Sequence, residues 1–152
     1  MCSIYKMNNK NKNATAVEIN HCISASTTMT PYAVRFVPCS SRLVALGQFA
    51  RGSGCFQVYN INGKSLKLTA EVETAKPIKC GTFGASSLET RAIATGNFVG
   101  DLAIYDVEVP ASPVYCVKAH EQIINAIDGV GGMTSQNGAP EIATASRDGR
   151  FV

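Results

Sequence analysis

The sequence has no long apolar run, no closely paired cysteines and no tryptophan, and the first two absences exclude whole classes of protein. No stretch approaches the roughly 18 consecutive apolar residues of a membrane-spanning helix. The first 12 residues are polar and rich in Asn and Lys, so they lack the apolar core of a secretory signal. We therefore expect neither a membrane anchor nor a signal peptide.

The cysteines are scattered. There is no Cys-x-x-Cys pair among Cys2, Cys22, Cys39, Cys55, Cys80 and Cys116. Zinc sites and the disulfide frameworks of small secreted proteins both depend on clustered or regularly spaced cysteines. We therefore expect buried, reduced thiols and no metal site.

Charge is sparse and nearly balanced, with 16% charged residues and a net charge of +3. Lys6, Lys10 and Lys12 supply this excess, since the remaining 11 cations are matched by 11 acidic residues from position 13 onward. A neutral body with a short basic N-terminus lacks the basic surface of a nucleic-acid-binding domain. The charge pattern therefore predicts no nucleic-acid partner.

A repeated pattern organises the chain. Ala94 to Asp106 (ATGNFVGDLAIYD) is a strand of small residues, a Gly-Asp turn and an alternating strand. Similar units begin 49 residues earlier, at Ala45 to Phe49 (ALGQF), and 49 residues later, at Ala143 to Arg147 (ATASR). A period of ~45 residues with four short strands per unit is typical of β-propeller blades. The predicted fold class is all-β: an incomplete WD-repeat β-propeller.

The repeat divides the chain into five parts. Residues 1–15 are expected to be a flexible polar tail, and 16–30 to hold a strand that completes the last blade of a closed ring. Blade one covers 31–73, blade two covers 74–118 and a partial blade three covers 119–152. Two blades and part of a third, of an expected seven, leave the ring open. Either the chain is a fragment or something outside it completes the ring.

Strand alternation predicts which large apolar side chains are buried. We expect this of Val34, Phe36, Phe83, Ile93, Ile104 and Ile127. Because the ring is open, one apolar face of blade one and one of blade three should be uncovered, and the edge at Arg150 to Val152 should be unpaired. Such surfaces predict that the isolated chain associates.

Blade three contains the residue types of a nucleophilic triad, His120, Ser146 and Asp148. Their register favours another interpretation. In WD repeats the His, Ser and Asp at these positions hydrogen-bond to a Trp on the third strand and hold the blade together. That Trp position lies past the end of the sequence in blade three, and Tyr59 and Tyr105 occupy it in the first two blades. A structural network is predicted, with a Ser/His/Asp hydrolase as a remote alternative that lacks a nucleophile elbow.

The turns between second and third strands share one face of a propeller. Arg51, Phe98, Arg147 and Arg150 lie on these turns. They are candidate partner contacts, since arginine and aromatic side chains are enriched at interface hot spots. The alternative is that they are ordinary loop residues. The glycine-rich loops match no phosphate-binding motif, and no cofactor is predicted.

Further motifs, outside the generic repeat positions, resemble those of the WD-repeat dynein axonemal assembly factors (the Monad family), from about Tyr32 to Gly149. They are VPCS (37–40), FARG (49–52), AKPIKCGTFGA (75–85), IINAIDG (123–129), GAPEI (138–142) and SRDG (146–149). The first 15 residues show no such resemblance.

The resemblance implies a non-catalytic, seven-bladed cytoplasmic propeller that takes part in preassembling ciliary dynein arms. It also implies protein partners, namely a prefoldin-like co-chaperone complex with AAA+ ATPases, and dynein chains. No nucleic acid, membrane or small-molecule substrate is implied. The location expected is the cytoplasm, at dynein preassembly sites or with ciliary association. A WD-repeat adaptor of another cytoplasmic complex, for example one linked to apoptosis, is the alternative.

Overall fold

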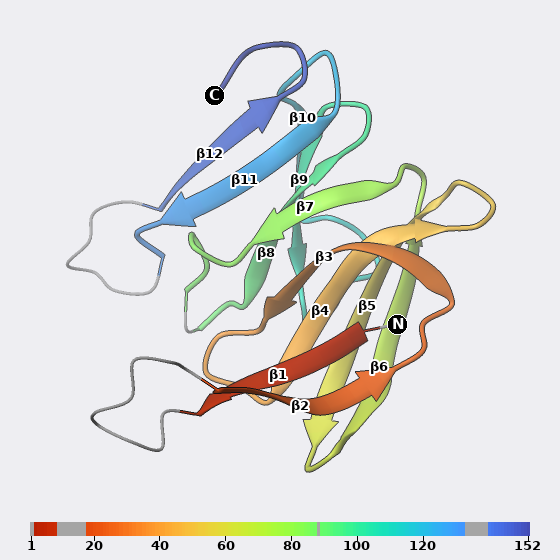
Figure 1. The fold of residues 1–152 in the computed structure, drawn as a ribbon. Coiled ribbons are helices and arrows are strands. Elements are labelled where there is room, and N and C mark those ends of the chain that lie inside the picture. Colours follow the sequence, from red (N-terminus) through yellow and green to blue (C-terminus); the bar gives the residue numbers. More distant parts are fainter. Residues whose placement is uncertain (1, 9–17, 88, 133–139) are drawn as a thin grey trace.

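The computed structural model describes residues 2–8, 18–87, 89–132 and 140–152 (Figure 1). Every regular element within these ranges is a β-strand, which confirms the all-β class. Among the described residues, no helix is long and apolar enough to cross a membrane. The strands are β1 (Cys2–Asn8), β2 (Glu18–Ala25), β3 (Met29–Phe36), β4 (Arg42–Phe49), β5 (Gly54–Asn62), β6 (Ser65–Thr74), β7 (Ile78–Thr82), β8 (Ala92–Asn97), β9 (Asp101–Asp106), β10 (Tyr115–Lys118), β11 (Ile124–Val130) and β12 (Glu141–Ser146).

Strands β3 to β6 form the first blade, a four-stranded antiparallel sheet in chain order. Its turns use glycine where the backbone is left-handed. Gly52 follows β4 at φ +91°, and Gly63 follows β5 at φ +59°. A side chain is disfavoured at such angles. Asn62 pairs with Ser65, so the hairpin expected here is present with Gly63 and Lys64 as its two loop residues.

Strands β7 to β10 form the second blade with the same meander. Its β8–β9 turn is closed by Asn97. The Asn97 side-chain oxygen accepts hydrogen bonds from the backbone amides of Val99 (3.0 Å) and Asp101 (2.9 Å). Its amide group donates to the Asp101 carboxylate at 2.9 Å. Gly100 takes φ +95° in the same turn, so this loop has a fixed conformation.

The third blade has two paired strands, β11 and β12. The residues after β12 return along it, because Phe151 bridges to Ala145 and Val152 exchanges backbone hydrogen bonds with Thr144 at 2.7 and 2.9 Å. The expectation that Arg150 to Val152 would be unpaired is therefore wrong on the β12 side. Phe151 is 87% exposed, as expected for a sheet with an open face.

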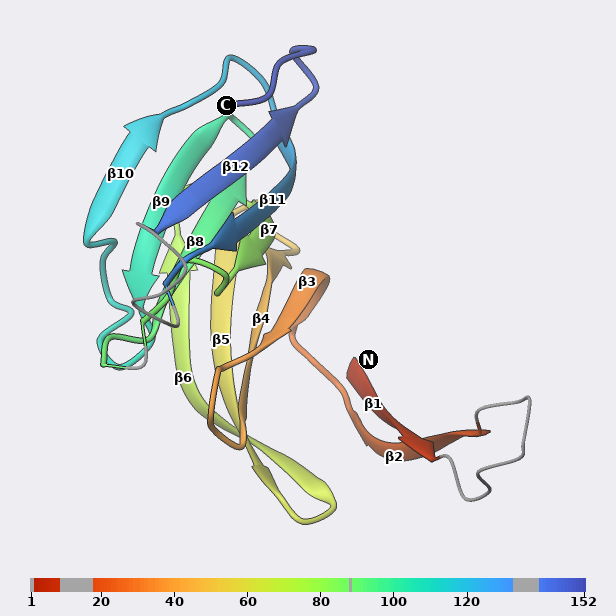
Figure 2. The ribbon, with the colours of Figure 1, turned by 90° about the vertical axis from the view of Figure 1, so that its left-hand side faces the viewer.

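The first strands of the three blades lie next to one another, since β3 contacts β7 and β7 contacts β11 (Figures 1 and 2). This is how inner strands surround a propeller axis. The core between blades one and two contains Val37, Val44, Leu46, Phe56, Val58, Ile78, Phe83, Ile93, Ala103, Tyr105 and Val107. The core between blades two and three contains Cys80, Ala94, Ile124 and Ile127, with Leu102, Ile104 and Ile142 partly buried beside them.

The N-terminal hairpin lies against the face of blade one that is turned away from blade two (Figure 2). β1 pairs with β2, and Ile4 stands opposite the buried Ile23. Ile4 also packs on a separate core made of Met29, Leu43, Ala45, Phe49, Cys55 and Tyr59. The face of blade one expected to be open is therefore partly covered.

One N-terminal expectation needs correction. The tail proposed for 1–15 contains the strand Cys2–Asn8, because its backbone is satisfied by pairing with β2. The strand expected within 16–30 is present as β2 and pairs here with this N-terminal strand, while its place in the last blade of a closed ring stays a prediction. Residues 1 and 9–15 of the tail lie outside the described residues.

The burial expectations hold for Phe83, Ile93 and Ile127, which are at most 7% exposed. Ile104 is partly buried. The expectation is wrong for Val34 and Phe36, which are exposed. Ala33, the residue before Val34 on β3, packs on the core between blades one and two, so alternation turns Val34 and Phe36 to the opposite face of the strand.

Candidate functional site

His120 is the centre of a buried polar network in blade three, and its side chain has no solvent exposure. Its Nδ1 lies 3.1 Å from the Asp148 carboxylate and its Nε2 lies 2.8 Å from the Thr144 hydroxyl. The same carboxylate accepts hydrogen bonds from the backbone amides of Glu121 (3.1 Å) and Arg150 (3.0 Å). The network therefore joins the segment before β11 to β12 and to the turn that follows it.

The pKa of Asp148 lies below its ordinary value. Burial acts to raise it, but hydrogen bonds from the backbone of Arg150 and Glu121 and from His120 outweigh burial and favour the charged carboxylate. The charged form is therefore the one that holds the turn.

Ser146 does not complete a triad with these residues. Its hydroxyl donates to the backbone carbonyl of Gln122 at 3.2 Å and accepts a hydrogen bond from the amide of Asp148 at 3.2 Å. The second ring nitrogen of His120 is hydrogen-bonded to the hydroxyl of Thr144, a residue that the sequence analysis did not identify. A signal was available, since Thr95 occupies the same repeat position and is also buried.

The two tyrosines predicted to belong to this network lie in the other blades. The Tyr59 hydroxyl donates to the Gln57 side chain at 2.7 Å, within the core under the N-terminal hairpin. Tyr105 packs on Phe56 between blades one and two, with ring centroids 5.4 Å apart. Burial raises the pKa of Tyr105. Both tyrosines therefore pack in blade cores and take no part in the side-chain contacts of His120 with Asp148 and Thr144.

Arg51, one of the four candidate contact residues, is held within its own blade. Its guanidinium forms an ion pair with Glu73 and lies 4.4 Å from the centre of the Phe49 ring. The hydrogen bond from Arg51 is the main cause that lowers the pKa of Glu73 to about 2. This arginine therefore has a local partner before any other protein binds.

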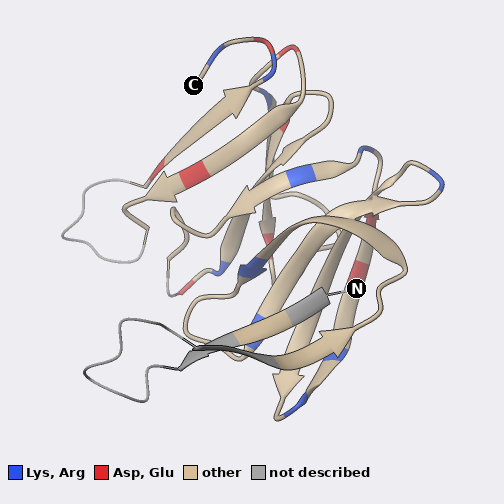
Figure 3. Ribbon diagram, in the orientation of Figure 1, with Lys and Arg blue, Asp and Glu red and all other residues tan. Residues whose placement is uncertain are grey.

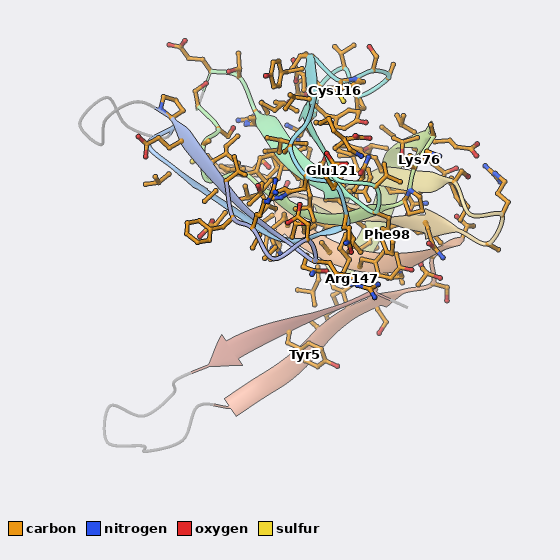
Figure 4. All side chains as sticks on the ribbon, turned by 90° about the horizontal axis from the view of Figure 1, so that it is seen from above. Tyr5, Lys76, Phe98, Cys116, Glu121 and Arg147 are labelled. Carbon is orange, nitrogen blue, oxygen red and sulfur yellow. The ribbon has the colours of Figure 1, made fainter. Side chains whose placement is uncertain are left out.

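Phe98 and Arg147 come together at one hollow of about 470 Å³, between the second and third blades. Its lining residues are Phe98, Val99, Lys118, Glu121, Gln122, Ile123 and Arg147. Figure 4, which looks onto the turns, shows Phe98, Glu121 and Arg147 over the same region. Arg150 is exposed on the next part of the β12 turn and does not line the hollow.

Strands β5 and β8 have no charged residue, whereas β6, β7 and β11 carry charged residues within their length, and many of the other charged residues lie at turns and strand ends (Figure 3). Within the ranges that the structure describes, no group of three or more His, Cys, Asp or Glu side chains is arranged to hold a metal ion. Cys39, Cys55, Cys80 and Cys116 are free cysteines. Cys55 and Cys80 are buried, and burial raises their thiol pKa values to about 12 and about 11. The expectation of burial is wrong for Cys22, Cys39 and Cys116, which are exposed.

No family model matches the chain. Curated proteins named dynein axonemal assembly factor 10 are similar to the chain in sequence. The Homo sapiens protein is 57% identical over 120 residues, covering 79% of this chain and 34% of that protein. The Bos taurus protein is 54% identical over 131 residues (86% and 36%), and the Danio rerio protein is 55% identical over 120 residues (79% and 34%). The chain spans about a third of the length of these relatives.

Among solved structures, a chain of the "Crystal Structure of Mitotic Checkpoint Complex" is similar, with a TM-score of 0.47 and 15% identity. The match covers 93% of this chain and 43% of that chain, and at this level it carries no argument. The identity to the curated relatives confirms the resemblance that the motifs suggested. This chain is a homologue of the curated proteins named dynein axonemal assembly factor 10 and spans about a third of their length.

Proposed function

We propose that the chain belongs to a non-catalytic scaffold that binds other proteins during the preassembly of axonemal dynein arms. The observation that carries this proposal is more than 50% identity, over about four fifths of the chain, to proteins named for dynein axonemal assembly. The fold supports it, because loops presented on packed sheets make a pre-formed surface for protein partners.

The geometry of Ser146 supports a non-catalytic role. A nucleophilic serine needs a general base on its hydroxyl. The Ser146 hydroxyl instead donates to the Gln122 carbonyl, and His120 is engaged by Asp148 and Thr144. Covalent labelling of Ser146 by a fluorophosphonate probe would contradict this part of the proposal.

The partners and location of the whole protein follow as part of the same proposal. We infer a co-chaperone adaptor that works in the cytoplasm, where it associates with a prefoldin-like complex containing AAA+ ATPases and with dynein chains. Affinity capture of the full-length protein from ciliated cells is expected to recover these subunits. Capture of a stable complex that lacks both would favour an adaptor of another cytoplasmic assembly.

The decisive experiment disrupts the gene in ciliated cells and examines axonemes in cross-section by electron microscopy. The expected result is axonemes short of dynein arms, restored when the full-length protein is supplied again. Normal arms and motility after complete loss of the protein would overturn the proposal.

A further inference from the structure

The hollow between blades two and three is lined by both apolar and charged side chains. Phe98, Val99 and Ile123 supply apolar surface, and Lys118 and Arg147 supply positive charge. Lys79 lies beside it, with its ammonium 6.0 Å from the centre of the Phe98 ring and 4.9 Å from that of Tyr32. This combination suits a ligand that has both an apolar side chain and negative charge.

Arg147 is the cation available to such a ligand. Its side chain is exposed, and it forms no ion pair or side-chain hydrogen bond within the described parts of the chain. The contrast with Arg51 is direct, since that guanidinium is already paired with Glu73. Lys118 is partly engaged, by the Val99 carbonyl and by Asp101 at 3.8 Å.

The three segments around the hollow are tied to one another through their backbones. The Gly100 carbonyl accepts hydrogen bonds from the amides of Ala119 (3.1 Å) and His120 (3.0 Å). The Arg147 amide donates to the Ile123 carbonyl at 3.0 Å. A site fixed in this way loses little conformational entropy when a ligand binds.

We propose that this hollow docks an acidic segment of a partner protein, with an apolar side chain over Phe98 and Ile123 and carboxylates at Arg147, Lys118 and Lys79. The proposal rests on the proposed scaffold function and names the chemistry of one partner. A nucleic acid fits less well, because the 11 cations from position 13 onward are matched by 11 acidic residues and do not form an extended basic surface.

Binding is tested with the peptide Gly-Asp-Glu-Phe-Glu-Asp-Gly, labelled with fluorescein and titrated with the 152-residue chain by fluorescence anisotropy. Two matched peptides replace the acids by their amides or the Phe by Ala. We expect the parent peptide to bind more tightly than either, and its affinity to fall with rising salt.

Arg147→Glu is expected to weaken binding of the parent peptide by about tenfold or more. Lys64→Glu is the matched control, since it makes the same charge change on the exposed β5–β6 turn, which does not line the hollow, and it should change affinity by less than about twofold. Circular dichroism of both variants should be unchanged, because both residues are exposed on turns.

Three results would overturn the proposal. They are an equal loss of peptide affinity in Arg147→Glu and Lys64→Glu, an amide peptide that binds as tightly as the parent peptide, and no detectable binding of the parent peptide. The proposal would also be overturned by a uridine oligonucleotide that displaces the peptide at equal concentration, or by a dimer of the chain that Arg147→Glu dissociates. The same variant can be tested in cells. If cells with Arg147→Glu have normal dynein arms while cells without the protein lack them, the docking site is rejected and the proposed scaffold function is not.

Discussion

The two contacts between blades are built differently although they join repeats of the same kind. Between blades one and two, large side chains such as Leu46, Phe56 and Ile93 are fully buried against one another. Between blades two and three, backbones approach closely. A Cβ placed on Gly84 would lie 1.8 Å from the Gly129 carbonyl oxygen, and one placed on Gly100 would lie 2.0 Å from the His120 carbonyl oxygen.

Contacts between blades of the same strand order can therefore be stabilised in two ways. An interface of large side chains is weakened most when atoms are removed, because a cavity remains. An interface of close backbones is weakened most when atoms are added, because the neighbour must move. The two blade contacts should therefore respond to opposite kinds of substitution.

The largest effect is expected from Phe56→Ala, which removes a fully buried ring between blades one and two. We expect the free energy of unfolding to fall by about 3–5 kcal/mol in urea titrations followed by circular dichroism. Phe36→Ala is the control, since Phe36 is 59% exposed and its loss should cost about 0.5 kcal/mol or less. Similar losses for both would mean that this interface is not packed as described.

The next effect is expected from Gly100→Ala, which tests the close approach of blades two and three. Gly63→Ala is the matched control, because both glycines have positive φ but nothing lies within 4 Å of a Cβ at Gly63. The control should cost about 1–2 kcal/mol from its backbone angle alone, and Gly100→Ala clearly more. Amide chemical shifts should change in β11 and β12 only for Gly100→Ala. Equal costs would refute the close approach.

A smaller and pH-dependent effect is expected from Asp148→Asn within blade three. Because the folded-state pKa of Asp148 is lowered, its charge contributes stability above the ordinary aspartate pKa, and this contribution is lost as pH falls through the lower folded value. The urea midpoint of the variant should therefore be lower than that of the parent at pH 7, and the two should converge on acidification. Glu141→Gln, at an exposed acid of β12, is the control. A difference that is constant with pH would contradict the account.

The smallest effect on stability is expected from Arg51→Gln. Removing the main hydrogen-bond donor should raise the pKa of Glu73 from about 2 toward its ordinary range, as seen in a carboxyl NMR titration. The unfolding midpoint should hardly change, because both side chains are exposed and their attraction is screened by salt. A low Glu73 pKa in the variant would show that another group sets it.

The repeat was enough to predict the strands of the two complete blades and the start of the third. This worked because small-residue strands, Gly turns and alternating strands recur at a fixed spacing, with Ala45, Ala94 and Ala143 at equivalent positions. Sequence spacing carries less information about which neighbour covers a strand. For that reason Val34 and Phe36, on the face of β3 opposite to Ala33, were wrongly expected to be buried.

The candidate site was predictable in part. Repeat register placed His120 and Asp148 in one network and Phe98 and Arg147 on one face, because turns at equivalent positions share an end of the sheet. It did not reveal that Thr144 binds His120. On a strand of small residues, a threonine is easily interpreted as a small packing residue and not as a hydrogen-bond partner. Nor did repeat register reveal that Arg51 is paired with Glu73, because Arg51 lies on the β4–β5 turn and Glu73 lies on β6, 22 residues away in the sequence.

The measurement that tests the account most directly is hydrogen–deuterium exchange of the 152-residue chain, read peptide by peptide. The account predicts the slowest exchange in β4, β5 and β8, whose residues are covered by neighbouring blades, and faster exchange in β11 and β12 with their open face. Equal protection of all three blades, or rapid exchange throughout β4 and β5, would contradict it.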